Sequence, residues 1–263
     1  MLNNNELIEK VVDQSSGVLE KVYDDLAHPT AKSIGNTLSL IPRTVGVWLG
    51  KWEKWVINGE ESIQLTAKAV AEKSANIPEE KLTAPEPYVA VPAIQQLSYC
   101  YNCEELRELY ANLLVSSMNV DKKYQVHPSF VDIIKQLSPL DAKAIEKIRQ
   151  VNTLIPIVTM RLDFVESSTF HELLYNYSID LLPVYGDNKI MCSSLENLDR
   201  LGIISVRYDQ SVKPDEVYDV FKEDDMYKDF KRQYESDKAK ITLKKGLIEL
   251  TSFGISFCNV CCD

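Results

Sequence analysis

The chain has 263 residues, of which 45% are hydrophobic and 26% are charged, so it is long enough and apolar enough to bury a substantial core. Its formal net charge is −10, and acidic residues outnumber basic ones in each of the segments 1–87, 88–187 and 188–263. No segment therefore has the surplus of Lys and Arg expected of a surface that binds nucleic-acid phosphates, and only 9 glycines argue against a glycine-rich nucleotide fold.

Residues 1–76 are predicted to form an N-terminal helical unit. Apolar side chains recur at helical spacing over 4–27, and a shorter helix with a polar face fits 60–75. The next segment, 77–92, contains four prolines, which remove backbone donors and restrict the backbone. We therefore expect an extended connector there, and it is the best internal boundary of the chain.

All three tryptophans of the chain, Trp48, Trp52 and Trp55, lie within eight residues at a spacing that places them on one side of a helix. Such a stripe can face the protein core, a protein partner or a membrane surface, and core packing is the most common of the three. If the protein has a surface for a partner, this tryptophan stripe is where we predict it.

Residues 93–187 are predicted to form a central helical region, and 104–148 has the pattern of three capped helices. Glu105 stands where the acid of a capping box belongs. Ser138 is the expected N-cap of the third helix, with Asp141 in its first turn. These polar residues are thus explained as caps and first-turn charges, not as catalytic groups.

Residues 188–263 change character. A helix that ends at Gly202 is followed by an expected strand at 203–208 and a second strand around 240–250, an order that resembles a winged helix. The charged insert between the strands, 209–239, is too long for a wing turn and is expected to contain its own helix. The predicted fold is therefore mainly α, with a winged-helix-like α+β subdomain at the C-terminal end.

Four stretches of the sequence resemble the Abi-alpha (abortive infection alpha) family of bacterial proteins. They are ELRELYANLLVSSM at 105–118, HPSF at 127–130, IIKQLSPLDA at 133–142, and ITLKKGLIELTSFGISFCNVC at 241–261, which contains a Leu-Thr-x-x-Gly-x-x-Phe pattern. The resemblance extends over roughly residues 30–262. It implies a role in phage defence, and it transfers no catalytic residue to this chain.

A winged helix would suggest DNA binding, and the local basic cluster is Lys240, Lys244 and Lys245 on the second expected strand. The expected recognition helix, residues 193–201, is net acidic. A structural or protein-binding role is therefore favoured for this module, with nucleic-acid contact by the three lysines as the alternative.

The sequence predicts no catalytic residue, no cofactor and no metal site. It has no His-Glu-x-x-His, no Gly-x-Ser-x-Gly and no phosphate-binding loop. Two Cys-x-x-Cys pairs, Cys100/Cys103 and Cys258/Cys261, are too far apart in sequence for a compact zinc ribbon. We expect these cysteines to be reduced thiols.

The N-terminal residues lack the pattern of a signal peptide, and no apolar run is long enough for a transmembrane helix. A cytoplasmic location is expected. The function hypothesis is a non-enzymatic anti-phage protein that acts through contact with a protein partner or a second copy. The alternatives are a nucleic-acid-binding sensor or regulator, a membrane-perturbing effector and, ranked last, an enzyme with an unfamiliar site.

Overall fold

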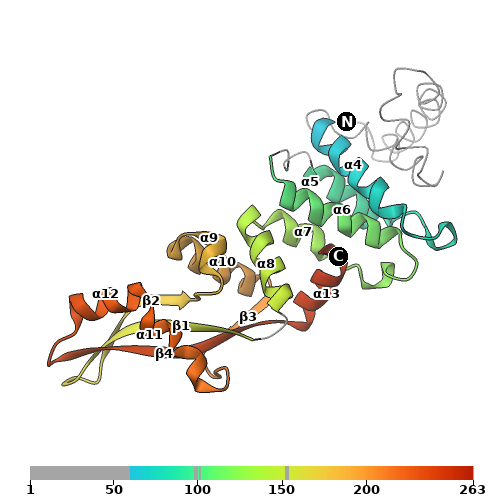
Figure 1. The fold of residues 1–263 in the computed structure, drawn as a ribbon. Coiled ribbons are helices and arrows are strands. Elements are labelled where there is room, and N and C mark those ends of the chain that lie inside the picture. Colours follow the sequence, from blue (N-terminus) through green and yellow to red (C-terminus); the bar gives the residue numbers. More distant parts are fainter. Residues whose placement is uncertain (1–59, 98–99, 101, 152–153, 263) are drawn as a thin grey trace, which may run out of the picture. The chain divides into compact units, whose positions relative to one another are not determined.

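The computed structural model describes residues 60–97, 100, 102–151 and 154–262 (Figure 1). By their contacts these residues divide into two compact units, and each is described by itself. The first contains the described residues up to 100 together with 114–124, and the second contains 102–113 and 125–262.

The tryptophan stripe, Trp48, Trp52 and Trp55, and the helix expected over 4–27 lie outside the described residues. The division of the chain at residues 76, 92 and 187 stays a prediction.

The first unit consists of short helices: α4 (Glu60–Ser74), η2 (Glu79–Lys81), α5 (Pro87–Leu97), the C-terminal part of α6 (Glu104–Met118) and part of η3 (Lys123–Gln125). Helix α5 begins within the proline-rich segment that was expected to be extended. Proline suits the first position of a helix, because the N–H that it lacks would have no partner inside the helix. Just before α5, the Thr83 N–H donates to the Met118 carbonyl at 2.8 Å, which ties this segment to the end of α6.

The second unit contains the N-terminal part of α6, the helices of the insert 209–239, and five further helices. These five are α7 (Ser129–Lys135), α8 (Pro139–Val151), α9 (Leu182–Tyr185), α10 (Asn188–Arg200) and α13 (Ser252–Cys261). The core between α7 and α13 is aromatic: the ring of Phe130 lies 5.4 Å from those of both Phe253 and Phe257. Phe130 and Phe257 are fully buried, so the HPSF stretch and the C-terminal helix contribute to the same core.

The start of α8 is the predicted capping arrangement. The Ser138 N–H donates to Asp141 Oδ2 at 2.7 Å, and the Asp141 N–H donates to Ser138 Oγ at 3.1 Å, so the two residues cap each other. Glu105 of α6 forms an ion pair with Lys143 of α8 at 2.9 Å, and this partner lowers the pKa of the Glu105 carboxyl.

The Leu-Thr-x-x-Gly-x-x-Phe pattern begins α13 and packs it closely against the chain before β3. Thr251 is the N-cap, and its Oγ1 accepts from the Gly254 N–H at 2.8 Å. The Thr251 N–H donates to the Ile203 carbonyl at 3.1 Å. A Cβ atom at Gly254 would lie 1.9 Å from that same carbonyl oxygen, so only glycine fits there.

The sheet has four antiparallel strands, β1 (Ile155–Phe164), β2 (Phe170–Tyr177), β3 (Ile204–Arg207) and β4 (Ala239–Leu250), in the order β2-β1-β4-β3. Strand β4 pairs with β1 along the whole of β1, whereas its pairing with β3 covers only four residues. Helix α10 packs against β2 and β3, and α12 (Asp225–Tyr234) packs against β4. In Figure 1 the turn of the β1–β2 hairpin lies at the far end of the sheet from α8 and α13.

This sheet shows that the prediction of a mainly α fold with a winged-helix-like end was wrong; the fold is α+β. The helix predicted before Gly202 is α10, and the two predicted strands are β3 and β4. Strand β4 also pairs with β1 on the side away from β3, and β2 pairs with β1. Both β1 and β2 lie in the segment 93–187, which was predicted to be helical. A two-stranded wing therefore does not exist here, because β4 is an inner strand of a larger sheet.

The charged insert 209–239 contains η4 (Asp215–Tyr218), α11 (Val220–Glu223) and α12, and a helix was expected within it. From η4 through α12, the buried residues are Tyr218 and Phe221, and α12 buries none of its side chains. The Tyr218 and Phe221 rings stack with their centroids 6.1 Å apart. Two aromatic side chains thus anchor this part of the insert.

Candidate functional site

The lysines predicted as nucleic-acid contacts lie on β4, not on a wing. Because side chains alternate along a strand, Lys240 and Lys244 lie on one face of the sheet and Lys245 lies on the other. The Lys244 ammonium lies 4.8 Å from the centre of the Tyr208 ring, and the Lys245 ammonium lies 5.2 Å from that of Tyr218. The fold therefore does not gather the three charges on one surface.

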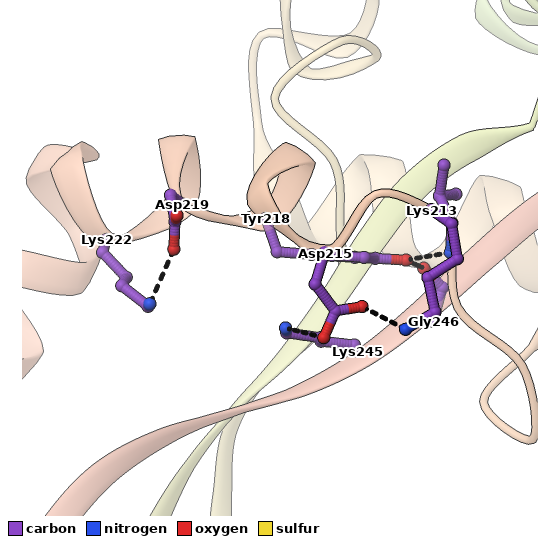
Figure 2. A network of polar contacts seen from close by, with 8 residues as sticks. Lys213, Asp215, Tyr218, Asp219, Lys222, Lys245 and Gly246 are labelled. Carbon is purple, nitrogen blue, oxygen red and sulfur yellow. Dashed lines mark hydrogen bonds and ion pairs between the residues drawn. The ribbon is translucent and has the colours of Figure 1, made fainter.

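Lys245 belongs to a network that fastens the insert to β4 (Figure 2). Asp215 accepts from Lys245 at 3.0 Å and from Lys213 at 2.5 Å, and these two cations lower the pKa of its carboxyl. The Tyr218 hydroxyl donates to the Gly246 carbonyl at 2.6 Å and accepts from the Val212 N–H at 2.9 Å. The charge of Lys245 is thus engaged within the protein.

Gly246 lies between two tyrosines on opposite faces of the sheet. Tyr218 binds its carbonyl, while a Cβ at this position would lie 2.6 Å from the ring of Tyr208. The absence of a side chain lets Tyr208 lie across the strands, and its hydroxyl donates to Asn176 Oδ1 on β2 at 3.0 Å. Burial raises the pKa of both tyrosines, so they stay protonated and act as hydrogen-bonding anchors.

A buried polar chain joins α8, α9 and α10. Ser194 donates to Asp141, and the Tyr185 and Ser194 hydroxyl oxygens are 2.7 Å apart. Because the single proton of Ser194 goes to Asp141, Tyr185 is the donor in the second bond. Asp141 is 4% exposed, and burial raises the pKa of its carboxyl. These groups are closed off from solvent and satisfy one another, as a structural network does.

The cysteines are free thiols in the structure. Burial raises the pKa of Cys192 to about 11 and that of Cys261 well above its usual range, so both are poor nucleophiles at neutral pH. Within the described part of the chain, no group of three or more His, Cys, Asp or Glu side chains is arranged to hold a metal ion.

The turn end of the β1–β2 hairpin exposes large apolar side chains. Phe164 is 40%, Val165 58% and Phe170 53% exposed, and we call these three residues the hairpin surface. The Arg161 guanidinium lies 4.5 Å from the centre of the Phe170 ring and so holds one face of it. Aromatic residues and arginine are enriched where proteins bind one another.

Sequence reasoning missed the hairpin surface because it assigned this region to helices. The available signal was the run Ile155–Phe164, which is rich in β-branched residues, followed by the polar turn residues 166–169 and a second strand-like run at 170–177. The exposure of particular side chains at the turn depends on the sheet and was not readable from the pattern.

Among the described residues, no helix is sufficiently long and apolar to span a membrane. A family model described as abortive infection alpha matches residues 58–261. Neither a curated protein nor a solved structure matches the chain.

Proposed function

The chain belongs to the abortive infection alpha family, and we propose that it acts in anti-phage defence by binding a protein partner through the hairpin surface. In this proposal the protein works in the cytoplasm and catalyses no reaction. The observation that supports it most is the group of large apolar side chains exposed at one end of the sheet.

Burial of these side chains would supply binding energy. Burial of apolar surface contributes about 25 cal/mol per Å² of surface removed from water. Large side chains such as Phe have the most surface to bury. Val165 and Phe170 share a face of the hairpin with Arg161, while Phe164 faces the other side. A partner that encloses the turn would therefore contact both faces.

The proposal is tested by the triple variant Phe164→Ser, Val165→Ser and Phe170→Ser. We expect it to fold and to lose protection, measured as plaque formation by a phage that the wild-type protein restricts. The matched control replaces Tyr88, Val120 and Tyr124 by Ser; these residues are 58%, 44% and 78% exposed and belong to the first unit. Full protection by the hairpin variant, or equal loss in the control, would contradict the proposal.

The tryptophan stripe is retained as a proposed second contact with the partner. Replacing Trp48, Trp52 and Trp55 together by Ala is expected to leave the protein folded and to reduce protection. Cooperative unfolding of this variant at a much lower temperature than wild type would instead assign the three rings to the core.

A further inference from the structure

The two edges of the sheet differ in how their backbone groups are used. At the β3 edge, the Val206 N–H donates to the Asp199 side chain of α10 at 3.0 Å, and α10 packs against the strand. That edge is therefore closed to another strand, in the way that natural proteins protect sheet edges. Strand β2 forms the opposite edge.

The pairing of β2 with β1 shows which of its backbone groups point outward. The Phe164 N–H donates to the Thr169 carbonyl at 2.9 Å, so this pair is hydrogen-bonded. In an antiparallel ladder bonded and non-bonded pairs alternate, and the register then makes Asp163–Phe170 and Arg161–Glu172 non-bonded pairs. The backbone N–H and C=O groups of Phe170 and Glu172 therefore point away from β1.

These outward groups are open to solvent. Phe170, His171 and Glu172 are all exposed, and among the described residues none donates to or accepts from the outward backbone of Phe170 or Glu172. The other end of β2 is closed, because the Asn176 N–H donates to the Tyr208 hydroxyl at 3.2 Å. The open part of the edge thus begins beside the hairpin surface and includes Glu172.

We propose that this edge binds an extended segment of a partner protein by strand addition, with a Lys or Arg of that segment opposite Glu172. The inference rests on the proposed function, since it specifies how the partner would bind. An added strand forms hydrogen bonds to the unpaired backbone groups of a sheet edge. The side chains that lie directly opposite one another across the new pair then determine which sequences bind.

The charges argue for a foreign strand over a second copy. Two copies related by a twofold axis would pair antiparallel through Phe170 and Glu172. One register places Glu172 opposite Glu172, which is a repulsive pair, and the other places Glu172 opposite Phe170 and His171 opposite itself. Neither gives Glu172 an opposite charge, whereas a basic residue in a partner strand does.

The key variant is Glu172→Pro in the full chain. Proline removes the outward N–H and leaves the bonds to β1 in place, and an edge strand tolerates it there. The control Glu172→Gln keeps the N–H and removes the charge. The probes are two short fluorescein-labelled peptides of alternating Thr and Val, one with a central Lys and one with a central Glu.

We expect the Lys peptide to bind wild type, about tenfold more weakly to Glu172→Pro and about three- to fivefold more weakly to Glu172→Gln. The Glu peptide should bind more weakly than the Lys peptide to wild type. Slower hydrogen exchange at the Phe170 and Glu172 amides with bound peptide, and unchanged exchange at His171, would locate the new strand.

Equal binding of the Lys peptide to wild type and to a folded Glu172→Pro variant would overturn strand addition. Light scattering that shows a wild-type dimer, lost in Glu172→Pro, would overturn the choice of a foreign strand. If the hairpin variant abolishes protection while Glu172→Pro retains it, the proposed function stands and strand addition falls. If the Lys peptide binds at the edge but neither the hairpin variant nor Glu172→Pro changes protection, the edge binds a strand and the proposed function falls.

Discussion

At the scale of single residues, the motifs that identify the family are packing motifs. Gly254 admits the carbonyl of Ile203, and Thr251 caps the helix that Gly254 belongs to. Ser138 and Asp141 cap each other at the start of α8. None of these residues needs a ligand to explain its position, because each satisfies a backbone group or makes room for one.

We predict that Gly254→Ala destabilises the protein by about 3 kcal/mol or more, because the added Cβ would require the backbone at Ile203 to move. The measurement is the free energy of unfolding by denaturant. Gly186→Ala is the matched control: Gly186 has φ +68° and open space around a Cβ, so about 1 kcal/mol of backbone strain is expected. Equal losses in the two variants would contradict a steric role for Gly254.

Asp141 gives a prediction about pH. Burial raises its pKa above the ordinary value of 3.8, so the folded protein holds this proton more tightly than the unfolded chain does. Its contribution to stability is therefore fully present below pH 3.8 and is lost as the pH rises through the folded-state pKa. The stability of wild type relative to Asp141→Asn should fall as the pH rises above about 4 in denaturant titrations. A difference that rises with pH would show that hydrogen bonds to the carboxylate dominate.

At the scale of elements, the insert is held to the sheet mainly through its first part. Tyr218 connects η4 to β4 through Gly246, and Asp215 connects it to Lys245. Helix α12 buries no side chain and packs against β4 with a partly exposed aromatic face. Loss of the Tyr218 contact should therefore loosen the whole insert while the four-stranded sheet stays intact.

We predict that Tyr218→Phe costs about 1–2 kcal/mol, since two hydrogen bonds are lost with little change of volume. Hydrogen exchange should quicken across 209–238 and stay unchanged in β1. The control is Tyr234→Phe in α12, where the side chain is 39% exposed and little effect is expected. Unchanged exchange in Tyr218→Phe would mean that the ion pairs of Asp215 suffice to hold the insert.

Elements that depend on interactions between near neighbours in the sequence could be predicted, whereas those that depend on distant pairing could not. Helices α6, α7 and α8 and the cap at Ser138 were predicted, because caps and helical periodicity are local signals. The sheet was not, since β1 pairs with β4 about eighty residues later and a short run of apolar residues does not distinguish strand from buried helix. The hairpin surface depends on that pairing, so it could not be predicted without the sheet.

At the scale of the whole molecule, the distribution of charge is the reason for proposing a protein partner and not a nucleic acid. The net charge is −10, and the three lysines that the alternative nucleic-acid hypothesis requires are divided between two faces of β4. A protein partner with basic residues suits this charge, and its association should slow with added salt as screening increases.

We predict that the full chain does not bind a short DNA duplex at about 50 mM salt, where phosphate contacts are at their strongest. The reason is that Lys245 is already paired with Asp215, while Lys244 lies against Tyr208 on the opposite face. Fluorescence anisotropy of labelled duplex measures this, with the variant Lys240→Gln, Lys244→Gln and Lys245→Gln as the control. Binding by wild type that weakens with salt and disappears in the triple variant would show that these lysines contact phosphate, and it would require the insert to release Lys245 from Asp215.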